Sequence, residues 1–186
     1  MLSGSKASVS LLSVREPLSH YEARLQKMGV SVNIHRANLR FHLLDGLSEN
    51  ALWDDPKFLV QARNQLVKQF KNDSQSSCVL VLDDIDTILE AIPHADLIDF
   101  IRDLLDEGIG VIAIAHEQIA AHRAALDCLK EIADASISLG RLPSGYTPDL
   151  DGQLQVQFFN GRTSPVFHFR QIDGNLSIME RGRLGL

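Results

Sequence analysis

Cysteine is scarce in this chain, with only Cys78 and Cys128 among 186 residues. Two cysteines provide neither a disulfide framework nor a cysteine-rich zinc site. Both lie among apolar residues, so the sequence predicts two buried thiols, which suits the reducing cytoplasm or nucleus. The chain also lacks an apolar run near the roughly twenty residues that a membrane span requires, and its start lacks the layout of a signal peptide. We therefore expect a cytoplasmic or nuclear protein with no membrane partner.

A glycine-rich phosphate loop is also missing. Such a loop must follow a strand and open a helix, because its backbone amides hold the phosphates and its lysine neutralises them. The nearest candidate, Ser3-Gly4-Ser5-Lys6, lacks the upstream glycine and the strand-to-helix context, and is interpreted as a flexible terminus. Gly108 and Gly110 precede a strand instead of following one, which is typical of a helix stop. The sequence thus argues against a nucleotide hydrolase that works alone, and we expect no cofactor.

Motifs for a nucleophile or a metal are absent too. The chain has no Gly-x-Ser-x-Gly elbow and no Cys/His pair in a nucleophile arrangement. His116, Glu117 and His122 invite comparison with zinc proteases, but zinc-binding histidines on one helix are about four residues apart, and these two are further apart. Their spacing rotates a helix by about 600°, which puts the two rings on different faces. We expect no catalytic residue and no metal site.

Charge is negative overall but unevenly spread along the chain. The formal net charge is -6 at pH 7, which disfavours a protein that coats nucleic acid. Residues 83–107 are rich in Asp and Glu, whereas basic residues dominate the first forty positions, namely Lys6, Arg15, Arg24, Lys27, Arg36 and Arg40. A segregated field can position an anion or dock a partner of opposite sign, although a solvated face is the commoner explanation.

The run from Ser77 to Asp86 is the most informative stretch of the sequence. Its apolar core is followed at once by Asp83 and Asp84, which is typical of a central parallel strand covered on both faces. Ligands bind at the carboxyl ends of such strands. The two aspartates resemble the Walker B position of nucleotide-hydrolysing proteins, where the first carboxylate helps to hold Mg²⁺. In the alternative interpretation, Asp84 only caps the helix that follows.

Periodicity predicts alternating strands and helices on either side of this run. Before it we expect a strand, a helix opened by Pro17 and ended by Gly29, an extended pair and a second helix, at 8–14, 17–28, 30–34 with 39–44, and 55–70. After it we expect a helix at 85–92, a break at Pro93, and an acidic helix whose Asp96, Asp99, Asp103 and Asp106 face solvent. A strand at Val111–Ala115 then leads into a helix that reaches about Lys130.

The C-terminal region has a different character. Ala135–Leu139 is strand-like, residues 141–152 form a loop, and three short runs of alternating polarity follow, the last two joined by a tight turn at Asp173-Gly174-Asn175. This pattern predicts a β-meander. The expected architecture is a mostly parallel α/β sheet extended by C-terminal antiparallel strands, in a single domain over residues 1–186.

Several motifs, taken in order, resemble subunit 6 of the Elongator complex. The series comprises Arg15-Glu16-Pro17-Leu18-Ser19-His20-Tyr21, Lys27-Met28-Gly29-Val30, the two aspartates after a strand, Leu97-Ile98-Asp99-Phe100 and Asp149-Leu150-Asp151-Gly152-Gln153-Leu154. A Phe-His-Phe-Arg run and the Asp-Gly-Asn turn complete it. The resemblance covers nearly the whole chain, and the order of the motifs makes the combination specific.

The resemblance implies a RecA-like P-loop NTPase fold without a Walker A loop. It implies a non-catalytic pseudo-ATPase that joins the paralogous subunits 4 and 5 in a hetero-hexameric ring. In this family the ring binds transfer RNA and serves a complex that modifies wobble uridine at C5, with the chemistry on a different subunit. The strand and helix that begin the family fold have no counterpart here. A shortened sheet leaves an edge for a partner to cover, unless the chain is an incomplete form.

The resemblance also implies where RNA would lie. Loops after the central strands of RecA-like rings face the pore, so Gln118–Ala124, with His122 and Arg123, is the predicted RNA-facing segment; ordinary exposed helix residues are the alternative. Two further functions stay open from the residues alone. One is an active ATPase of the RecA or recombinase-paralogue class with Asp83 as the Mg²⁺ ligand. The other is an adaptor that binds a basic protein through its acidic helix, 96–107.

Overall fold

A computed structural model describes residues 7–38, 40–47, 57–72, 77–145, 147–172 and 175–180. The chain divides into two compact units, Met1–Leu126 and Asp127–Leu186, and each is described by itself. Compactness alone does not test whether two units fold as one domain, so the single domain over 1–186 stays a prediction. Within the described parts of the chain, no helix is long and apolar enough to cross a membrane.

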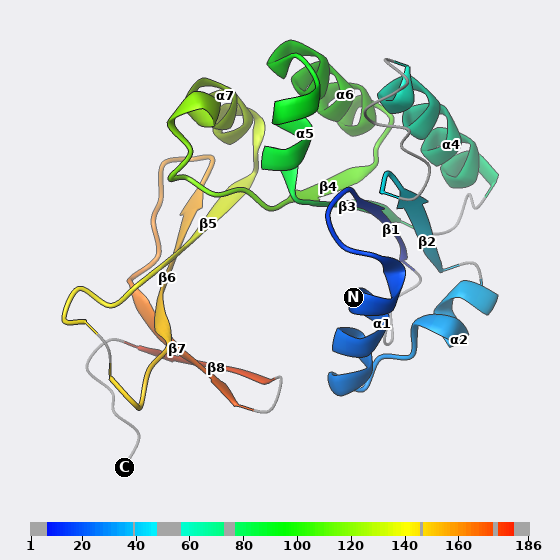
Figure 1. The fold of residues 1–186 in the computed structure, drawn as a ribbon. Helices are drawn as coiled ribbons and strands as arrows, with labels where there is room; N and C mark the ends of the chain where they lie inside the picture. The colour runs from blue at the N-terminus through cyan, green and yellow to red at the C-terminus, as the bar shows by residue number, and fades with distance from the viewer. Residues whose placement is uncertain are drawn as a thin grey trace. The chain divides into compact units, whose positions relative to one another are not determined.

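The first unit is built on a four-stranded parallel sheet with the strand order β2-β1-β3-β4 (Figure 1). The strands are β1 (Ser8–Ser13), β2 (Phe41–Asp45), β3 (Cys78–Asp83) and β4 (Gly110–Ala113). Ser13 is in register with Asp45 on one side and with Asp83 on the other. All four strands run in the same direction, so their carboxyl ends form one polar edge.

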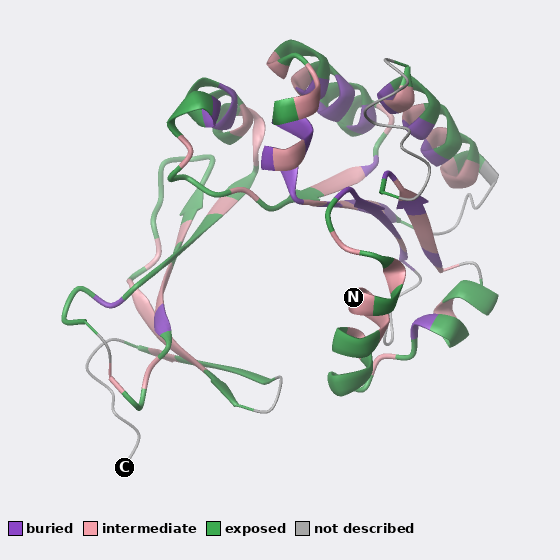
Figure 2. Ribbon diagram, in the orientation of Figure 1, coloured by how far each residue is buried: buried purple, intermediate pink, exposed green. Residues whose placement is uncertain are grey.

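Helices cover both faces of this sheet (Figure 1). On one face lie α1 (Leu18–Lys27) and α2 (Val32–Ala37); on the other lie α4 (Phe58–Asn72), α5 (Ile85–Ala91) and α6 (His94–Asp106). Figure 2 shows buried residues concentrated on β1, β3 and the sides of the helices turned to the sheet. The core is dominated by leucines and isoleucines with almost no exposed surface, among them Leu12, Leu66, Leu80, Leu82, Ile88, Leu97 and Leu104. Two-sided cover is what the apolar β3 sequence predicts.

The predicted extended segment at 30–34 is wrong, because Val32–Ala37 forms the helix α2. Val30, Val32 and Ile34 alternate with polar residues, which favours a strand on pattern alone. In the fold, Val32 is buried against Leu11 and Phe41, whereas Ile34 is 61% exposed. Tertiary packing of one side chain therefore outweighs the local alternation.

Two further expectations need correction in the segment after β4. The helix predicted to begin after Glu117 starts only at Arg123, as α7 (Arg123–Ile132), and a single 3₁₀ turn over Ala120–His122 precedes it. Cys78 is buried as predicted, but Cys128 is exposed. The buried residues of α7 are Ala125 and Leu126, and Cys128 is not among them. Apolar sequence neighbours did not reveal which face of the helix the thiol occupies.

Other elements are confirmed. The strand at 8–14, the helix between Pro17 and Gly29, and the break at Pro93 between two helices all appear. The acidic residues of α6 are exposed as expected, and Asp103 pairs with Arg63 of α4, with 3.0 Å between Nε and Oδ2. The Ser3–Lys6 segment, the Asp55-Pro56 helix start and the Asp173-Gly174 turn lie outside the described residues.

The second unit is the predicted β-meander. It is a four-stranded antiparallel sheet of β5 (Ala135–Gly140), β6 (Gly152–Phe158), β7 (Phe167–Ile172) and β8 (Asn175–Glu180), in that order. The antiparallel strands thus form a sheet of their own instead of continuing the parallel ladder. A Cβ atom on Gly152 would lie 2.6 Å from the carbonyl oxygen of Gly140, so the close approach of β5 and β6 requires glycine there.

One face of the meander is apolar by register. Ile137 lies opposite Val156, Leu139 opposite Leu154, and Phe169 opposite Ile178. Opposed residues share a face of an antiparallel sheet, and serines and glutamines alternate with them. Figure 2 shows these strands mostly exposed or intermediate.

Candidate functional site

Asp83 ends β3 at the carboxyl edge of the parallel sheet, where the sequence predicted a ligand site. The Tyr21 hydroxyl, from α1, donates a hydrogen bond to Asp83 Oδ2 at 2.9 Å. The same hydroxyl lies 3.1 Å from Oγ of Ser13, the buried last residue of β1. Burial, together with the hydrogen bond to Asp83, raises the pKa of Tyr21 to about 12. Tyr21 is therefore a neutral donor at ordinary pH, and it engages one oxygen, Oδ2, of the Asp83 carboxylate.

Asp84 is the N-cap of α5, as the alternative interpretation predicted. Its Oδ1 accepts from the backbone amide of Thr87 at 2.9 Å, and its Oδ2 accepts from Arg15 Nη1 at 3.0 Å. Asp84 is 3% exposed. Burial raises the pKa of Asp84, but hydrogen bonds from Thr87 and Arg15 outweigh it and hold the pKa below its ordinary value of 3.8. Both oxygens of Asp84 thus have partners within the chain.

Asp86 forms a third cluster that the sequence did not predict. Its Oδ2 accepts from the backbone amide of His116 at 2.7 Å and lies 2.9 Å from Nδ1 of the same residue. Its Oδ1 lies 2.9 Å from His122 Nδ1. Burial raises the pKa of Asp86, but hydrogen bonds from His122 and His116 outweigh it and lower the pKa. An ionised carboxylate only accepts, so both Nδ1 atoms carry the hydrogen.

The spacing argument that separated His116 from His122 is wrong for this fold. It assumed one continuous helix, whereas the segment is a turn followed by a 3₁₀ turn. The loop lets both rings reach Asp86, His116 at Oδ2 and His122 at Oδ1. A usable signal was present: Asp86 and His116 each follow an apolar strand closely, and adjacent parallel strands bring such residues to one edge.

His122 is not on the surface. It is 4% exposed, and its ring also packs edge-on against His94 at a centroid distance of 6.0 Å. His122 is thus buried with its Nδ1 held by Asp86, unlike an exposed helix residue, and its contact with RNA stays a prediction. Arg123 is exposed at the start of α7, and its contact with RNA stays a prediction.

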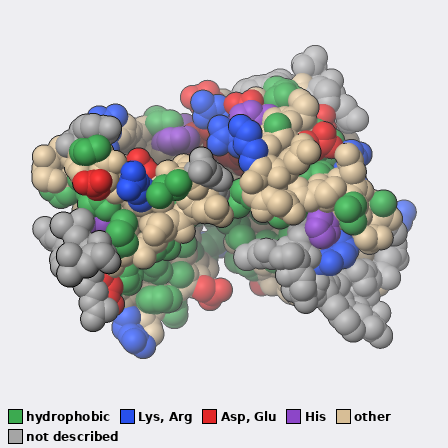
Figure 3. All heavy atoms as spheres, turned by 90° about the horizontal axis from the view of Figure 1, so that it is seen from below, with side chains coloured by type: hydrophobic (Ala, Val, Ile, Leu, Met, Phe, Trp, Pro, Cys, Tyr) green, Lys and Arg blue, Asp and Glu red, His purple; other side chains and the backbone are tan. Residues whose placement is uncertain are grey.

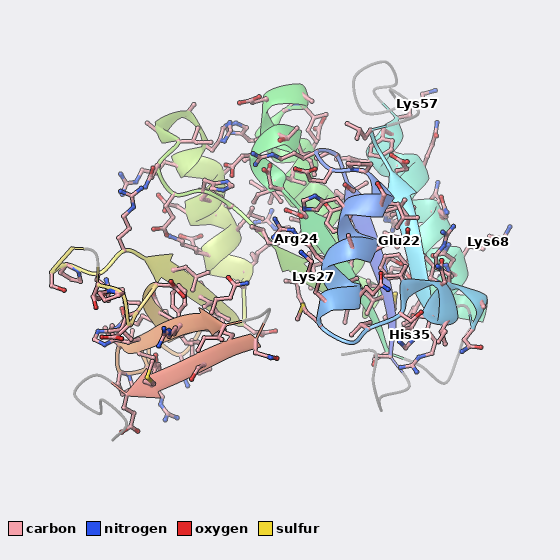
Figure 4. The ribbon with its side chains drawn as sticks, turned by 60° about the horizontal axis from the view of Figure 1, so that its bottom comes forward. Glu22, Arg24, Lys27, His35, Lys57 and Lys68 are labelled. Carbon is pink, nitrogen blue, oxygen red and sulfur yellow. The ribbon has the colours of Figure 1, made fainter. Side chains whose placement is uncertain are left out.

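The cationic residues of the first unit do not converge on one point. Figure 4 shows Arg24 and Lys27 on α1, His35 on α2 and Lys68 on α4 as separate side chains on three helices. Basic and acidic side chains are intermixed on the surface seen in Figure 3. No group of three or more His, Cys, Asp and Glu residues within the described ranges is placed to hold a metal ion. Of the basic residues in the first forty positions, Arg15 pairs with Asp84, while Arg24 and Lys27 lie on α1.

The turn from β1 into α1 differs from a phosphate loop in its residues. Val14, Arg15, Glu16 and Pro17 connect the two elements without glycine. The Ser13 hydroxyl closes the turn onto the Glu16 carbonyl. A side chain from the end of β1 thus bonds the backbone of this turn, and Arg15 from the turn forms an ion pair with Asp84.

Comparisons with known proteins identify the fold. No family model and no curated protein matches the chain. An uncharacterized protein from Pyrococcus horikoshii, solved with an unknown peptide, has a TM-score of 0.67 at 10% identity, over 95% of this chain and 81% of that one. A KaiC-like protein from Pyrococcus horikoshii OT3 has a TM-score of 0.65 at 14% identity, over 92% and 76%. The predicted fold class is confirmed: the chain has a RecA-like α/β fold, with a parallel sheet and C-terminal antiparallel strands.

Proposed function

We propose that this chain is a non-catalytic RecA-like subunit of the Elongator ring, assembled with the paralogous subunits 4 and 5. In this role it supports transfer RNA binding and the modification of wobble uridine at C5 by another subunit. The proposal combines the RecA-like fold with the series of motifs from Arg15-Glu16-Pro17 to the Asp-Gly-Asn turn. The chain itself supplies shape and contact surface.

The observation that carries the proposal is the state of the two carboxylates at the Walker B-like position. A carboxylate that holds Mg²⁺ must offer an oxygen to the ion or to its water. Here both oxygens of Asp84 accept hydrogen bonds, Oδ1 from the amide of Thr87 and Oδ2 from Arg15. Oδ2 of Asp83 accepts from Tyr21. The β1–α1 turn beside them has no glycine to receive phosphate. These contacts engage both oxygens of Asp84 and Oδ2 of Asp83 within the chain, which supports a role for this edge in holding the fold together.

Ring assembly tests the proposal directly. When the chain is co-expressed with subunits 4 and 5, native mass measurement is expected to find one six-membered assembly that contains all three proteins. The control omits this chain, and the two remaining subunits should then give no particle of that mass. A chain that purifies alone beside an assembly of the other two would contradict the proposal.

A second candidate, an ATPase, is favoured by one observation. Asp83 is only half-buried and sits at the carboxyl end of a central strand, which is where Mg²⁺ binds in RecA-like hydrolases. Under the non-catalytic proposal, calorimetric titration of the chain with Mg-ATP gives no binding heat. Micromolar binding that Asp83→Asn abolishes and Asp103→Asn leaves intact would favour the ATPase instead. Asp103 is the matched control because it is an exposed acid on α6.

A further inference from the structure

The turn that follows β6 holds the only asparagine of the sequence that precedes a glycine, Asn160 before Gly161. Gly161 donates to the carbonyl of Phe158 at 2.9 Å and has a φ of 76°. Phe158 in turn donates to the carbonyl of Arg162 at 2.8 Å, so the chain reverses tightly over these residues. A left-handed φ at the end of such a turn favours glycine. These contacts all lie within the second unit.

The Asn160 side chain is folded onto the backbone of this turn. Its Oδ1 accepts from the amide of Arg162 at 3.1 Å, a contact by which asparagine side chains close turns. The Gly161 nitrogen lies one residue before that amide, so the contact holds the side-chain carbonyl on the stretch of backbone that includes this nitrogen. Asn160 Cγ and the Gly161 nitrogen are therefore restrained together, which favours a reaction between them.

The surroundings of these two atoms assist attack of the Gly161 nitrogen on Asn160 Cγ. The Arg162 amide already donates to the oxygen on which negative charge develops during the attack, as a donor in an oxyanion hole does. Glycine has no side chain to crowd its nitrogen, and a Cβ atom on Gly161 would find nothing within 4 Å beyond its chain neighbours. The hydrogen bond from Gly161 to Phe158 lies in the peptide plane, whereas the attack uses the face of the nitrogen.

We propose that Asn160 is a site of self-modification, at which the chain converts this asparagine to aspartate and isoaspartate. The Gly161 nitrogen bonds to Cγ, the Cγ–Nδ2 bond breaks, and Nδ2 leaves as ammonia with the proton of the Gly161 nitrogen, which closes a succinimide ring. Water then opens the ring. Cleavage of the Cγ–N bond gives aspartate, and cleavage between the Asn160 backbone carbonyl and the nitrogen gives isoaspartate. Water is the only other reactant, and nothing is oxidised or reduced.

The two products change the turn differently. Aspartate keeps the backbone and offers a carboxylate to the Arg162 amide, which is a stronger, charge-assisted contact. Isoaspartate leads the backbone through Cβ and Cγ and so lengthens it inside the turn. The hydrogen bond between Phe158 and Arg162 and the pairing of Gln157 with Thr163 then lose their register. Either product adds a negative charge to a chain whose net charge is -6. The inference does not depend on the proposed ring.

Peptide mapping by mass spectrometry tests the site in the folded, unaltered chain. The chain is incubated at mildly alkaline pH and digested at intervals, and a sample digested without incubation corrects for conversion during digestion. Asn160 is expected to convert about fivefold or more faster than asparagines whose next residue carries a side chain. Those internal controls are Asn33, Asn38, Asn64 and Asn175. The product should contain both aspartate and isoaspartate, because direct hydrolysis of the side chain gives aspartate alone.

Two variants connect the reaction to this turn. Gly161→Ala puts a methyl group beside the attacking nitrogen and is expected to slow conversion by about fivefold or more. Arg162→Ala is the matched control, because it keeps the amide that binds Oδ1 and should leave the rate unchanged. Alanine is strained at a φ of 76°, so circular dichroism checks that both variants are folded.

The decisive comparison is made in the unaltered chain and does not require either variant to fold. Conversion of Asn160 no faster than that of the four control asparagines would overturn the proposal. Conversion that occurs only when urea unfolds the chain, or that yields aspartate without isoaspartate, would overturn it as well.

Discussion

Asp86→Ala is expected to lower the free energy of unfolding of the first unit by about 3 kcal/mol. The change leaves the buried Nδ1 of His122 and the amide and ring of His116 without their common acceptor. A buried donor without a partner costs free energy, because the hydrogen bond that it made to water in the unfolded chain is not replaced. Urea unfolding followed by circular dichroism measures the loss.

Asp106→Ala is the matched control, because Asp106 is an exposed acid near the end of α6. It should change the free energy of unfolding by no more than about 0.5 kcal/mol. Equal losses in the two variants would show that the Asp86 cluster does not stabilise the unit.

Acid is expected to remove the same contribution from the unaltered chain. Because the pKa of Asp86 is lowered by folding, the unfolded chain binds a proton more readily near the ordinary value of 3.8. The stabilisation is therefore present above that value and declines as pH falls through the lower folded pKa. Asp84 contributes with the same sign. Below about pH 4, the stability of Asp86→Ala should decline less steeply than that of the unaltered chain; parallel curves would contradict this assignment.

Leu82→Ala is expected to cost about 3 kcal/mol, within the range of about 2–5 kcal/mol for fully buried leucines. Leu82 has no exposed surface and precedes Asp83 on β3. Its removal leaves a cavity under the strand that positions Asp83 and Asp84. Chemical unfolding of the first unit, followed by amide exchange in β3, reports the loss.

The control for Leu82 is on the same strand. Val79→Ala changes a half-buried side chain and should cost clearly less, about 1 kcal/mol, because less apolar surface leaves water on folding. A Leu82→Ala cost no larger than that of Val79→Ala would mean that the first unit is loosely packed around β3.

The features that local pattern determined are those whose cause lies within a few residues. The apolar run before Asp83 predicted β3, proline at position 93 predicted the break between α5 and α6, and alternation predicted the meander. The cap at Asp84 was one of the two interpretations that the sequence left open. It could be proposed from sequence because Asp84 and the Thr87 amide that it accepts from are only three residues apart. Short-range hydrogen bonds and periodicity leave a direct trace in sequence.

The features that only the tertiary structure decided depend on residues brought together from afar. Asp86 meets His116 and His122 across 30 and 36 positions, and no spacing rule connects a loop to a helix start. The helix at α2 depends on the burial of Val32 by β1 and β2, which overrides an alternating pattern. Likewise, the sequence predicted the strands β1, β3 and β4, but only the tertiary structure decided their order, in which β1 and β3 are neighbours. Composition fixes how apolar a strand is, but only packing decides which neighbours cover it.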